Sequence, residues 1–411
     1  MSTTMKPSLI AATVAALVIS AGVARAVEQP FDQIQGGRYQ AVLGDCAGCH
    51  TAPGGKPYAG GVALQTPFGT LVAPNITPDR ETGIGAWSEE DFRRALKQGI
   101  GHGGERLYPA MPYPAYTKMT DSDVAALWAY FQTIEPVSNE VHSNQLPFPF
   151  NIRLLMAGWN WLNLTPGEFK ADPNKSDQWN RGAYLVEGAG HCSVCHAPKS
   201  ALGADKGAMT GTVLQGWFAP NITGNLHDGV GQWSVDDIVA YLKTGVGRGS
   251  VGSGPMREVI ENSTSKMNDA DLKAIAVYLK DLPGGEGKGP APVAKDSPAM
   301  QTGARIYAVN CSACHNGDGS GQVNLFPKLA GNSVVQQGDP TSLIHVVLAG
   351  SQGAATDAQP TTPAMPSLAW RLTDQQVADV LTYIRNSWGN AAPPVAPDAV
   401  RKLRDSTKGG S

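Results

Sequence analysis

Three stretches of the chain carry apolar residues at helical spacing, and each stretch opens with a residue that caps helices. An acid or an amide follows each cap three positions later, which is the signature of a helix start: Thr120 with Asp123, Asn268 with Asp271, and Thr373 with Gln376. Apolar residues then recur at i, i+3, i+4 and i+7: Val124, Leu127, Trp128 and Phe131; Leu272, Ile275, Ala276 and Leu279; Val377, Val380, Leu381 and Ile384. A tyrosine falls in the same register each time: Tyr130, Tyr278 and Tyr383. The shared phase predicts three related amphipathic helices, and therefore a duplicated unit.

Other parts of the unit also recur. A glycine with a nearby tyrosine lies upstream in each copy, where a small residue would let the final helix cross closely: Gly37 with Tyr39, Gly182 with Tyr184, and Gly303 with Tyr307. The first two copies share Ala-Pro-Asn-Ile-Thr, at 73–77 and 219–223, and a Trp-Ser start to a middle helix. The third copy has Phe326-Pro-Lys-Leu-Ala-Gly-Asn332 instead. Copies one and two are therefore the closer relatives.

Composition fits a soluble chain of several domains. The 411 residues are 42% hydrophobic and 16% charged, with 48 glycines and 30 prolines, which indicates long loops and modest helix content. A net charge of −3 gives no reason to expect nucleic acid as a partner. At the N-terminus, Lys6, an apolar run from Leu9 to Ile19 and Ala24-Arg25-Ala26 predict a secretory signal peptide over 1–26. We expect an exported protein, and no later stretch is apolar for long enough to span a bilayer.

All six cysteines belong to one motif that occurs three times. It is Cys46-Ala-Gly-Cys49-His50, then Cys192-Ser-Val-Cys195-His196, then Cys311-Ser-Ala-Cys314-His315. C-x-x-C-H is the attachment site of a c-type haem: the two thiols bond to the porphyrin, and the histidine supplies the proximal iron ligand. A structural zinc site needs four ligands, and each motif offers three. The flanks do not resemble a thioredoxin-like setting, and a disulfide framework suits shorter, cysteine-dense chains. The sequence therefore predicts three covalently bound haems.

A second axial ligand to each iron is expected from methionine, because a His–Met pair suits electron transfer. Met111 and Met365 both lie in an Ala-Met-Pro loop before the final helix, and Met256 occupies the corresponding place in the second copy. Met119 and Met267 sit directly before the helix caps, where the third copy has Leu372. Since leucine cannot bind iron, this position is interpreted as a hydrophobic staple. The remaining histidines are interpreted as structural or surface residues, and of these only His102 and His227 could compete as ligands: His102, His142, His191, His227 and His345. Asn75 and Asn221 form turns, the interpretation we favour, or hydrogen-bond a haem propionate.

Two connectors separate the copies. Residues 284–297 are rich in Gly, Pro and Lys and predict a flexible linker. Within the other connector, 136–178, the stretch 146–164 is aromatic and apolar, with Arg153 its only charge. It either clamps the first two domains together or forms a docking surface for a partner subunit or a membrane interface. The predicted organisation is a signal peptide, three domains with these connectors, and a polar tail: 1–26, 27–135, 136–178, 179–283, 284–297, 298–390 and 391–411.

Together, these motifs give the chain a family resemblance. The three C-x-x-C-H units, the Ala-Pro-Asn-Ile-Thr repeats, Ala110-Met111-Pro112 and Trp388-Gly389-Asn390 resemble the tri-haem cytochrome c subunit of bacterial periplasmic dehydrogenases, over 30–390. That family serves alcohol, gluconate, fructose, sorbitol, FAD-dependent glucose, and molybdenum aldehyde or nicotinate dehydrogenases. The resemblance implies a dehydrogenase catalytic subunit as partner, with or without a small third subunit. It also implies ubiquinone or another respiratory acceptor, and a periplasmic location with or without peripheral attachment to the cytoplasmic membrane.

The expected fold is all-α, with three tandem class I cytochrome c domains that each wrap one haem. The expected function is outer-sphere electron transfer, in which no side chain does acid–base or nucleophilic work. Two alternatives are a free periplasmic electron shuttle and a haem enzyme such as a peroxidase. The peroxidase would need an open iron face, which the three methionines argue against.

Overall fold

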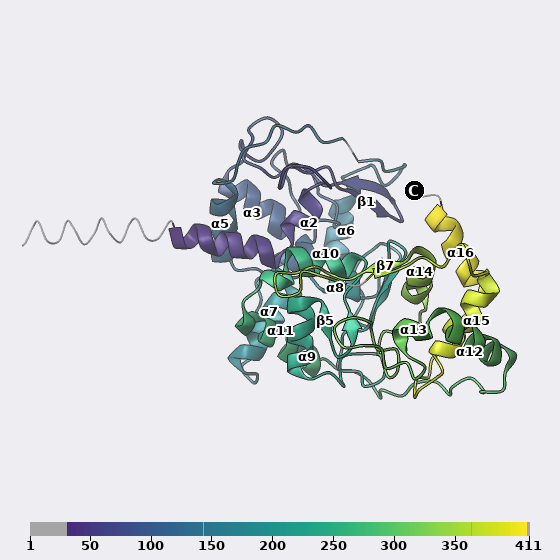
Figure 1. Cartoon of the computed structure of the whole chain (residues 1–411). Helices are drawn as coiled ribbons and strands as arrows, with labels where there is room; N and C mark the ends of the chain where they lie inside the picture. Colours follow the sequence, from purple (N-terminus) through teal and green to yellow (C-terminus); the bar gives the residue numbers. More distant parts are fainter. Residues whose placement is uncertain (1–30, 143, 363, 409–411) are drawn as a thin grey trace, which may run out of the picture.

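A computed structural model describes residues 31–408 except 143 and 363. The predicted signal peptide, 1–26, lies outside these residues. The described chain is rich in helices, joined by long loops and four short hairpins (Figure 1). In none of the described helices is there a segment both long and apolar enough to cross a bilayer.

The elements follow one another in three motif regions, 31–135, 177–283 and 298–390. The first region contains a helix over 31–43, then α2 (Cys46–His50), β1 (Ala63–Thr66), β2 (Gly69–Val72), α3 (Glu89–Gln98), α4 (Tyr113–Tyr116) and α5 (Asp121–Phe131). The connector holds α6 (Leu155–Asn163). The second region contains α7 (Asp177–Glu187), α8 (Ser193–His196), β3 (Thr212–Leu214), β4 (Trp217–Ala219), α9 (Val235–Thr244), β5 (Val246–Gly247), β6 (Ser250–Val251), α10 (Pro255–Asn262), the 3₁₀ turn η1 (Thr264–Lys266) and α11 (Asp269–Asp281). The third region contains α12 (Pro298–Asn310), α13 (Ser312–His315), α14 (Thr341–Ala349), β7 (Ser351–Gln352), β8 (Ala364–Met365) and α15 (Asp374–Ile384), and α16 (Pro397–Lys408) follows it.

One helix crossing recurs in all three regions. The first helix of each region crosses the last one at a glycine of the first helix. Gly37 contacts α5, Gly182 contacts α11, and Gly303 contacts α15. A Cβ at Gly37 would lie 1.8 Å from the carbonyl oxygen of Ala126 and 2.8 Å from Cβ of Tyr130. The matching distances are 2.0 Å and 2.8 Å at Gly182, and 2.3 Å and 2.6 Å at Gly303, where the tyrosines are Tyr278 and Tyr383. The predicted close crossing at the shared tyrosine register is therefore confirmed.

The expected helix starts are confirmed as well. The side chains of Thr120, Asn268 and Thr373 accept hydrogen bonds from the backbone N–H groups three residues on. Ser88 and Ser234 begin the middle helices α3 and α9 with complete capping boxes. The staple residues are buried beside the first turn of each final helix: Met119, Met267 and Leu372.

The all-α expectation needs a correction, because four two-stranded antiparallel hairpins accompany the helices. In β1–β2, Ala63 pairs with Val72 and Thr66 with Gly69; in β3–β4, Thr212 pairs with Ala219; β5–β6 and β7–β8 have two residues per strand. Their short strands alternate too weakly to be seen against the glycine-rich loops around them. The hairpins fold those loops back onto the helices.

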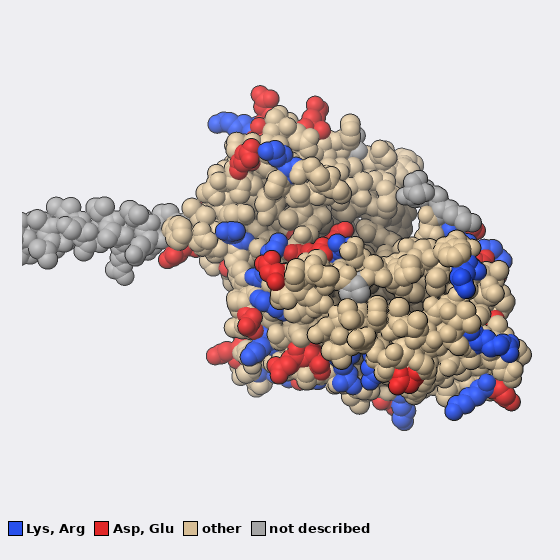
Figure 2. Space-filling model, in the orientation of Figure 1, with Lys and Arg blue, Asp and Glu red and all other residues tan. Residues whose placement is uncertain are grey.

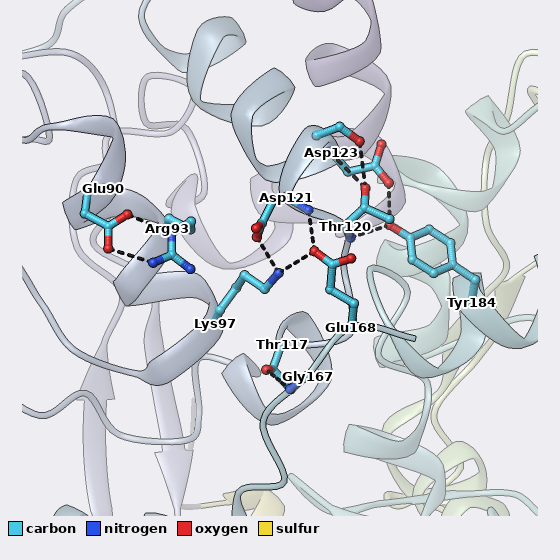
Figure 3. Close-up of polar contacts among 11 residues, drawn as sticks. Glu90, Arg93, Lys97, Thr117, Thr120, Asp121, Asp123, Gly167, Glu168 and Tyr184 are labelled. Carbon is cyan, nitrogen blue, oxygen red and sulfur yellow. Dashed lines mark hydrogen bonds and ion pairs between the residues drawn. The ribbon is translucent and has the colours of Figure 1, made fainter. Parts of the chain in front are cut away.

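The first two regions share one hydrophobic core, and the third has its own. Two tyrosines join the first pair across their boundary. Tyr184 accepts a hydrogen bond from the N–H of Thr120 at 3.1 Å and donates to Asp123, at the start of α5 (Figure 3). Tyr39 makes the reciprocal contact at the start of α11. Each of the two final helices is thus capped partly by a tyrosine from the other region.

The second and third regions meet where the β3–β4 hairpin lies against α14. Ser342 binds both backbone groups of Phe218, accepting from its N–H at 2.8 Å and donating to its carbonyl at 2.9 Å. His345 donates to the carbonyl of Gly216 at 3.0 Å and stacks on Trp217, with ring centroids 4.1 Å apart. At this junction, side chains of the third region therefore hold the backbone of the β3–β4 hairpin.

The predicted linker and the predicted polar tail both make defined contacts with the third region. In the predicted linker, the N–H of Val293 donates to Asn386 at 3.0 Å. In the predicted polar tail, 397–408 forms α16, which packs on α14 and α15 with Val400 fully buried. Arg404 fixes this helix by donating to the carbonyls of Ala369 and Leu372. Because α16 is mostly polar, its composition did not indicate that one face of this helix would be buried.

Candidate functional site

Each C-x-x-C-H motif forms a single helical turn, which brings its two thiols and its histidine onto adjacent positions. These turns are α2, α8 and α13 (Figure 1). None of the six cysteines forms a disulfide, and burial raises the pKa of Cys46 and of Cys192 to about 12. A redox-active Cys-x-x-Cys pair needs a lowered thiol pKa instead, because the thiolate is the reactive form. The first thiol of each of these two motifs is thus unlike the reactive thiol of a disulfide oxidoreductase.

The three motif histidines are oriented in the same way. Nδ1 of His50 donates to the carbonyl of Pro74 at 2.7 Å, Nδ1 of His196 to Pro220 at 2.7 Å, and Nδ1 of His315 to Pro327 at 3.0 Å. Metal-binding histidines typically donate one ring N–H to a carbonyl, which fixes the tautomer and leaves the other nitrogen as ligand. Here that nitrogen is Nε2, which makes no hydrogen bond to any described residue in these three histidines. The arrangement fits a proximal ligand.

Burial also sets the protonation state of these rings. It lowers the pKa of His50, His196 and His315, while the proline carbonyls act in the opposite direction. Burial is the larger cause, because the charged imidazolium loses more solvation than one carbonyl restores. The neutral imidazole that a metal requires is therefore the favoured form.

Two of the three prolines that accept these bonds belong to a repeated segment. In the first two regions they are the prolines of Ala-Pro-Asn-Ile-Thr, and Asn75 and Asn221 hold the segments in shape. Oδ1 of Asn75 accepts from the N–H of Thr77 at 2.9 Å and from its hydroxyl at 2.8 Å, and Asn221 binds Thr223 in the same way. The favoured turn interpretation is confirmed. The turn presents the preceding proline carbonyl to the histidine.

The candidate methionines border the same cores as the motif cysteines. Met111 and Met256 pack against the core that also holds Cys46 and Cys192, and Met365 packs against the core that holds Cys311. Met111 lies in the loop before α4, Met256 in the first turn of α10, and Met365 in β8, paired with Ser351. All three are partly buried, whereas Met119 and Met267 are buried within the core. This difference agrees with a ligand role for the former and a packing role for the latter.

A buried arginine suggests that an anionic group completes the third region. Arg385 is fully buried, and Nη2 donates to the carbonyl of Gln337 at 2.7 Å. Its Nε and Nη1 have no hydrogen-bond partner among the described residues, and burial lowers its pKa to about 10. A buried guanidinium with unsatisfied donors is costly. A haem propionate would supply acceptors of the right charge, so the residues present fit haem.

Other metal chemistry finds no support within the described residues, which contain no cluster of three or more His, Cys, Asp or Glu able to hold an ion. Of the two competing histidines, His102 is engaged with Asp91 at 2.9 Å and stacks on Trp87. His227 is packed against Gly289, and its Nε2 is buried without a hydrogen bond to any described residue. His191 donates to the carbonyl of Gly44 at 3.2 Å, which places the first two motifs side by side. His345 serves the junction with the third region.

The proline carbonyls and the reciprocal tyrosines are the site features that motif analysis missed. A backbone acceptor leaves no side-chain signal, but the spacing offers one in retrospect. Pro74 and Pro220 each follow their histidine by 24 residues, whereas Pro327 follows His315 by 12. The equal spacing in the first two regions is a repeat that could have been read from the sequence.

Comparison with known proteins agrees with this geometry. The family model described as "Cytochrome c" matches residues 38–135 and 300–388. The cytochrome c subunit of alcohol dehydrogenase (quinone) from Gluconobacter oxydans is 38% identical, over 96% of this chain and 87% of its own. The gluconate 2-dehydrogenase cytochrome c subunit of Pantoea cypripedii is 38% identical, over 91% and 90%. The fructose dehydrogenase cytochrome subunit of Gluconobacter japonicus is 37% identical, over 91% and 83%.

Proposed function

Because the chain belongs to the family of cytochrome c subunits of dehydrogenase complexes, we propose that its three motifs each hold one c-type haem in a domain of its own. The chain is an electron-transfer subunit and not the catalytic one. Our proposal extends this to three tandem haem domains, with electrons entering from a dehydrogenase catalytic subunit. They leave to ubiquinone or another respiratory acceptor on the periplasmic side of the cytoplasmic membrane.

The observation that carries the proposal is the threefold repetition of one histidine geometry. Three cysteine pairs, none of them in a disulfide, each end in a histidine whose Nδ1 is held by a proline carbonyl. A chance C-x-x-C-H sequence would not bring its own carbonyl acceptor with it. The three relatives described above carry "cytochrome" in their names, and their match extends over more than nine-tenths of the chain.

The protein's part in electron transfer is to hold, orient and shield. Bound haem supplies a one-electron carrier at each motif. The cysteines Cys46, Cys49, Cys192, Cys195, Cys311 and Cys314 would anchor it, and His50, His196 and His315 would present Nε2 to the iron. Met111, Met256 and Met365 would each supply a second ligand to the iron, and methionine ligation would raise its reduction potential. The helix crossings and the junctions between regions keep the motifs at fixed separations.

Intact mass and iron content of the exported protein test the haem count. We expect the mass of three haems and three irons per chain, and the double substitution of Cys311 and Cys314 by Ala should remove one of each. Unmodified cysteines in the wild-type chain, or another iron count, would overturn the proposal. A five-coordinate high-spin haem in the oxidised spectrum would favour the peroxidase-like alternative.

The partner is tested by isolating the chain from its native host under mild conditions. We expect a dehydrogenase catalytic subunit to accompany it and to reduce its haems when substrate is added. Isolation of the chain alone, still reducible only by small mediators, would favour the free shuttle.

A further inference from the structure

Each motif histidine donates to the carbonyl of one peptide group, and the N–H at the other end of that group is free to bind a second partner. In chain order, the three groups are those between Pro74 and Asn75, Pro220 and Asn221, and Pro327 and Lys328. A peptide group that donates through its N–H is polarised, so its carbonyl oxygen becomes a stronger acceptor. The partner of the N–H therefore acts on the histidine through a single planar group.

In the second motif, a buried side chain of the third region binds this N–H. The N–H of Asn221 donates to Oε1 of Gln337 at 3.2 Å, and both residues are buried. Nε2 of Gln337 donates to the carbonyl of Asp228 and, at 3.1 Å, to that of Ser333. Because both carbonyls are acceptors only, the amide nitrogen must face them and the oxygen must face Asn221. His196 and Gln337 thus bind the same peptide group from opposite ends.

The third motif shows the same arrangement in the opposite direction. The N–H of Lys328 donates at 2.8 Å to the carbonyl of Gly249, in the turn between β5 and β6 of the second region. A Cβ at Gly249 would lie 2.8 Å from Cβ of Lys328, and its φ is +76°, so the close approach requires glycine. In Figure 2 the surface is continuous between the places where Figure 1 draws α9 of the second region and α13 of the third. Each of these regions supplies the acceptor behind the other's histidine.

The first motif has no such acceptor within the described part of the chain. The N–H of Asn75 makes no hydrogen bond to any residue there, although the carbonyl of Pro74 accepts from His50 as usual. The distance from Nδ1 to the carbonyl oxygen is 2.7 Å in the first motif and 2.7 Å in the second. The first motif is therefore a reference for the second, since the two differ in the partner of the N–H.

We propose that Gln337 and Gly249 tune the second and third haems across this boundary, by strengthening the carbonyl that holds each proximal histidine. The inference rests on the proposed function, because it takes each motif to hold a haem. A stronger acceptor makes the imidazole a more basic ligand, which favours the ferric state and lowers the reduction potential. Gln337 is a positioning residue, since it acts through a peptide group and His196. The second and third haems then depend on each other's regions, and the first lacks this control.

Substitution of two neighbouring glutamines tests the second haem. In redox titration of the full-length holoprotein, Gln337→Met should shift its one-electron equilibrium toward the reduced form by about threefold, or about 30 mV, because the cooperative gain is a fraction of one hydrogen bond. The matched control is Gln336→Met. Gln336 is also buried and donates to the carbonyl of His227 at 3.1 Å, but it does not bind the Pro220–Asn221 peptide. Gln337→Glu should keep the wild-type potential, since a buried neutral acid retains one acceptor and one donor.

A pair of glycines tests the third haem in the same titration. Gly249→Ala should displace Lys328 and raise the potential of the third haem, while the second keeps its wild-type value. Gly207→Ala is the control, because Gly207 has φ +78° and a Cβ there would meet nothing within 4 Å. It introduces the same backbone strain without the collision. Met111→Leu and Met365→Leu identify the first and third waves of the titration by removing an axial ligand from each.

The wild-type protein allows a comparison that needs no substitution. In proton NMR of the reduced holoprotein, isotopically labelled at histidine, the Nδ1–H proton of His196 should lie downfield of that of His50. The two hydrogen bonds have equal lengths, and only the Pro220–Asn221 peptide donates onward to a described residue. In Gln337→Met the His196 signal should move toward that of His50. This comparison decides the inference if Gln337→Met fails to take up three haems.

The outcomes separate this inference from the proposed function. An unmoved second potential in Gln337→Met, an equal shift in Gln336→Met, or a His196 signal upfield of that of His50 would overturn the tuning. Any of these results in a protein that carries three irons would leave the proposed function intact. Wild type that does not carry three haems would instead refute the proposed function.

Discussion

The hydroxyl of Tyr39 donates a hydrogen bond to the carboxylate of Asp271 at 2.8 Å, although 232 residues separate them. The same hydroxyl accepts from the N–H of Asn268 at 3.2 Å, at the start of α11. Tyr184 repeats both contacts in the opposite direction, at Asp123 and Thr120. The first two regions are thus related by an exchange of equivalent tyrosines, and separating them would leave a helix N-terminus short of a partner on each side.

Removing both hydroxyls should loosen this exchange. We expect Tyr39→Phe and Tyr184→Phe each to lower the free energy of unfolding by about 1–2 kcal/mol, because each leaves a partly buried carboxylate and an N–H without that partner. Denaturant unfolding of the holoprotein measures the effect. Tyr108→Phe is the control, since its hydroxyl donates to the carbonyl of Phe150 and not across this boundary. Equal losses in all three variants would contradict a special role for the exchange.

Alkaline pH should release the same contacts. Burial is the main cause that raises the pKa of Tyr39 and of Tyr184 from 10.0 to about 12. A group whose folded pKa exceeds its unfolded value stabilises the fold fully below the unfolded pKa, and this stability falls as pH rises through the folded pKa. Wild type should therefore lose stability between about pH 10 and pH 12, and the double phenylalanine variant should lose less over that window. Parallel pH profiles for the two proteins would show that other groups dominate.

A neighbouring pair of glycines gives a sharp test of the helix crossing. A Cβ at Gly37 would collide with the backbone of α5, whereas a Cβ at Gly36 would meet only Cβ of Ala126, at 3.9 Å. We expect Gly37→Ala to destabilise the protein by about 3 kcal/mol through overpacking. Gly36→Ala should be neutral or stabilise it by up to about 1 kcal/mol, since alanine favours helix. Thermal unfolding of both variants decides, and similar behaviour would show that the helices can separate without cost.

The two kinds of methionine should respond differently to leucine. Met111→Leu should remove the methionine–iron charge-transfer absorption of one haem and lower its reduction potential, because methionine ligation raises that potential. Met119→Leu should leave the spectrum intact and cost less than about 1.5 kcal/mol, since the swap conserves volume and the third region has Leu372 at this place. Spectroscopic redox titration compares them. A spectrum lost in the Met119 variant and kept in the Met111 variant would reverse the assignment.

Local patterns predicted much of the helical frame. The caps at Thr120, Asn268 and Thr373 and the glycine crossings depend on residues close together in sequence or in the same register of a repeat, so the pattern contains the information. The turn at Asn75 is equally local, because its side chain binds a residue two positions away.

Contacts between regions were beyond such patterns. Nothing near Tyr39 indicates that its partner lies on α11, because the contact follows from how two whole regions pack. The carbonyl of Pro74 is a backbone group that any residue could offer to His50. Helix α16 was missed for a related reason: its sequence is mostly polar, and Val400 becomes a core residue only against α14 and α15.

The segment that orients His196 is bound at both ends by residues more than a hundred positions further along the chain. Pro220, which accepts the imidazole N–H, lies between Phe218, bound by Ser342, and Asn221, whose N–H donates to Gln337 at 3.2 Å. The position of the Pro220 carbonyl, and with it the orientation of the imidazole, therefore depends on residues of the third region. An engineer who transplanted the second region alone would carry over the histidine without the brace that aims it.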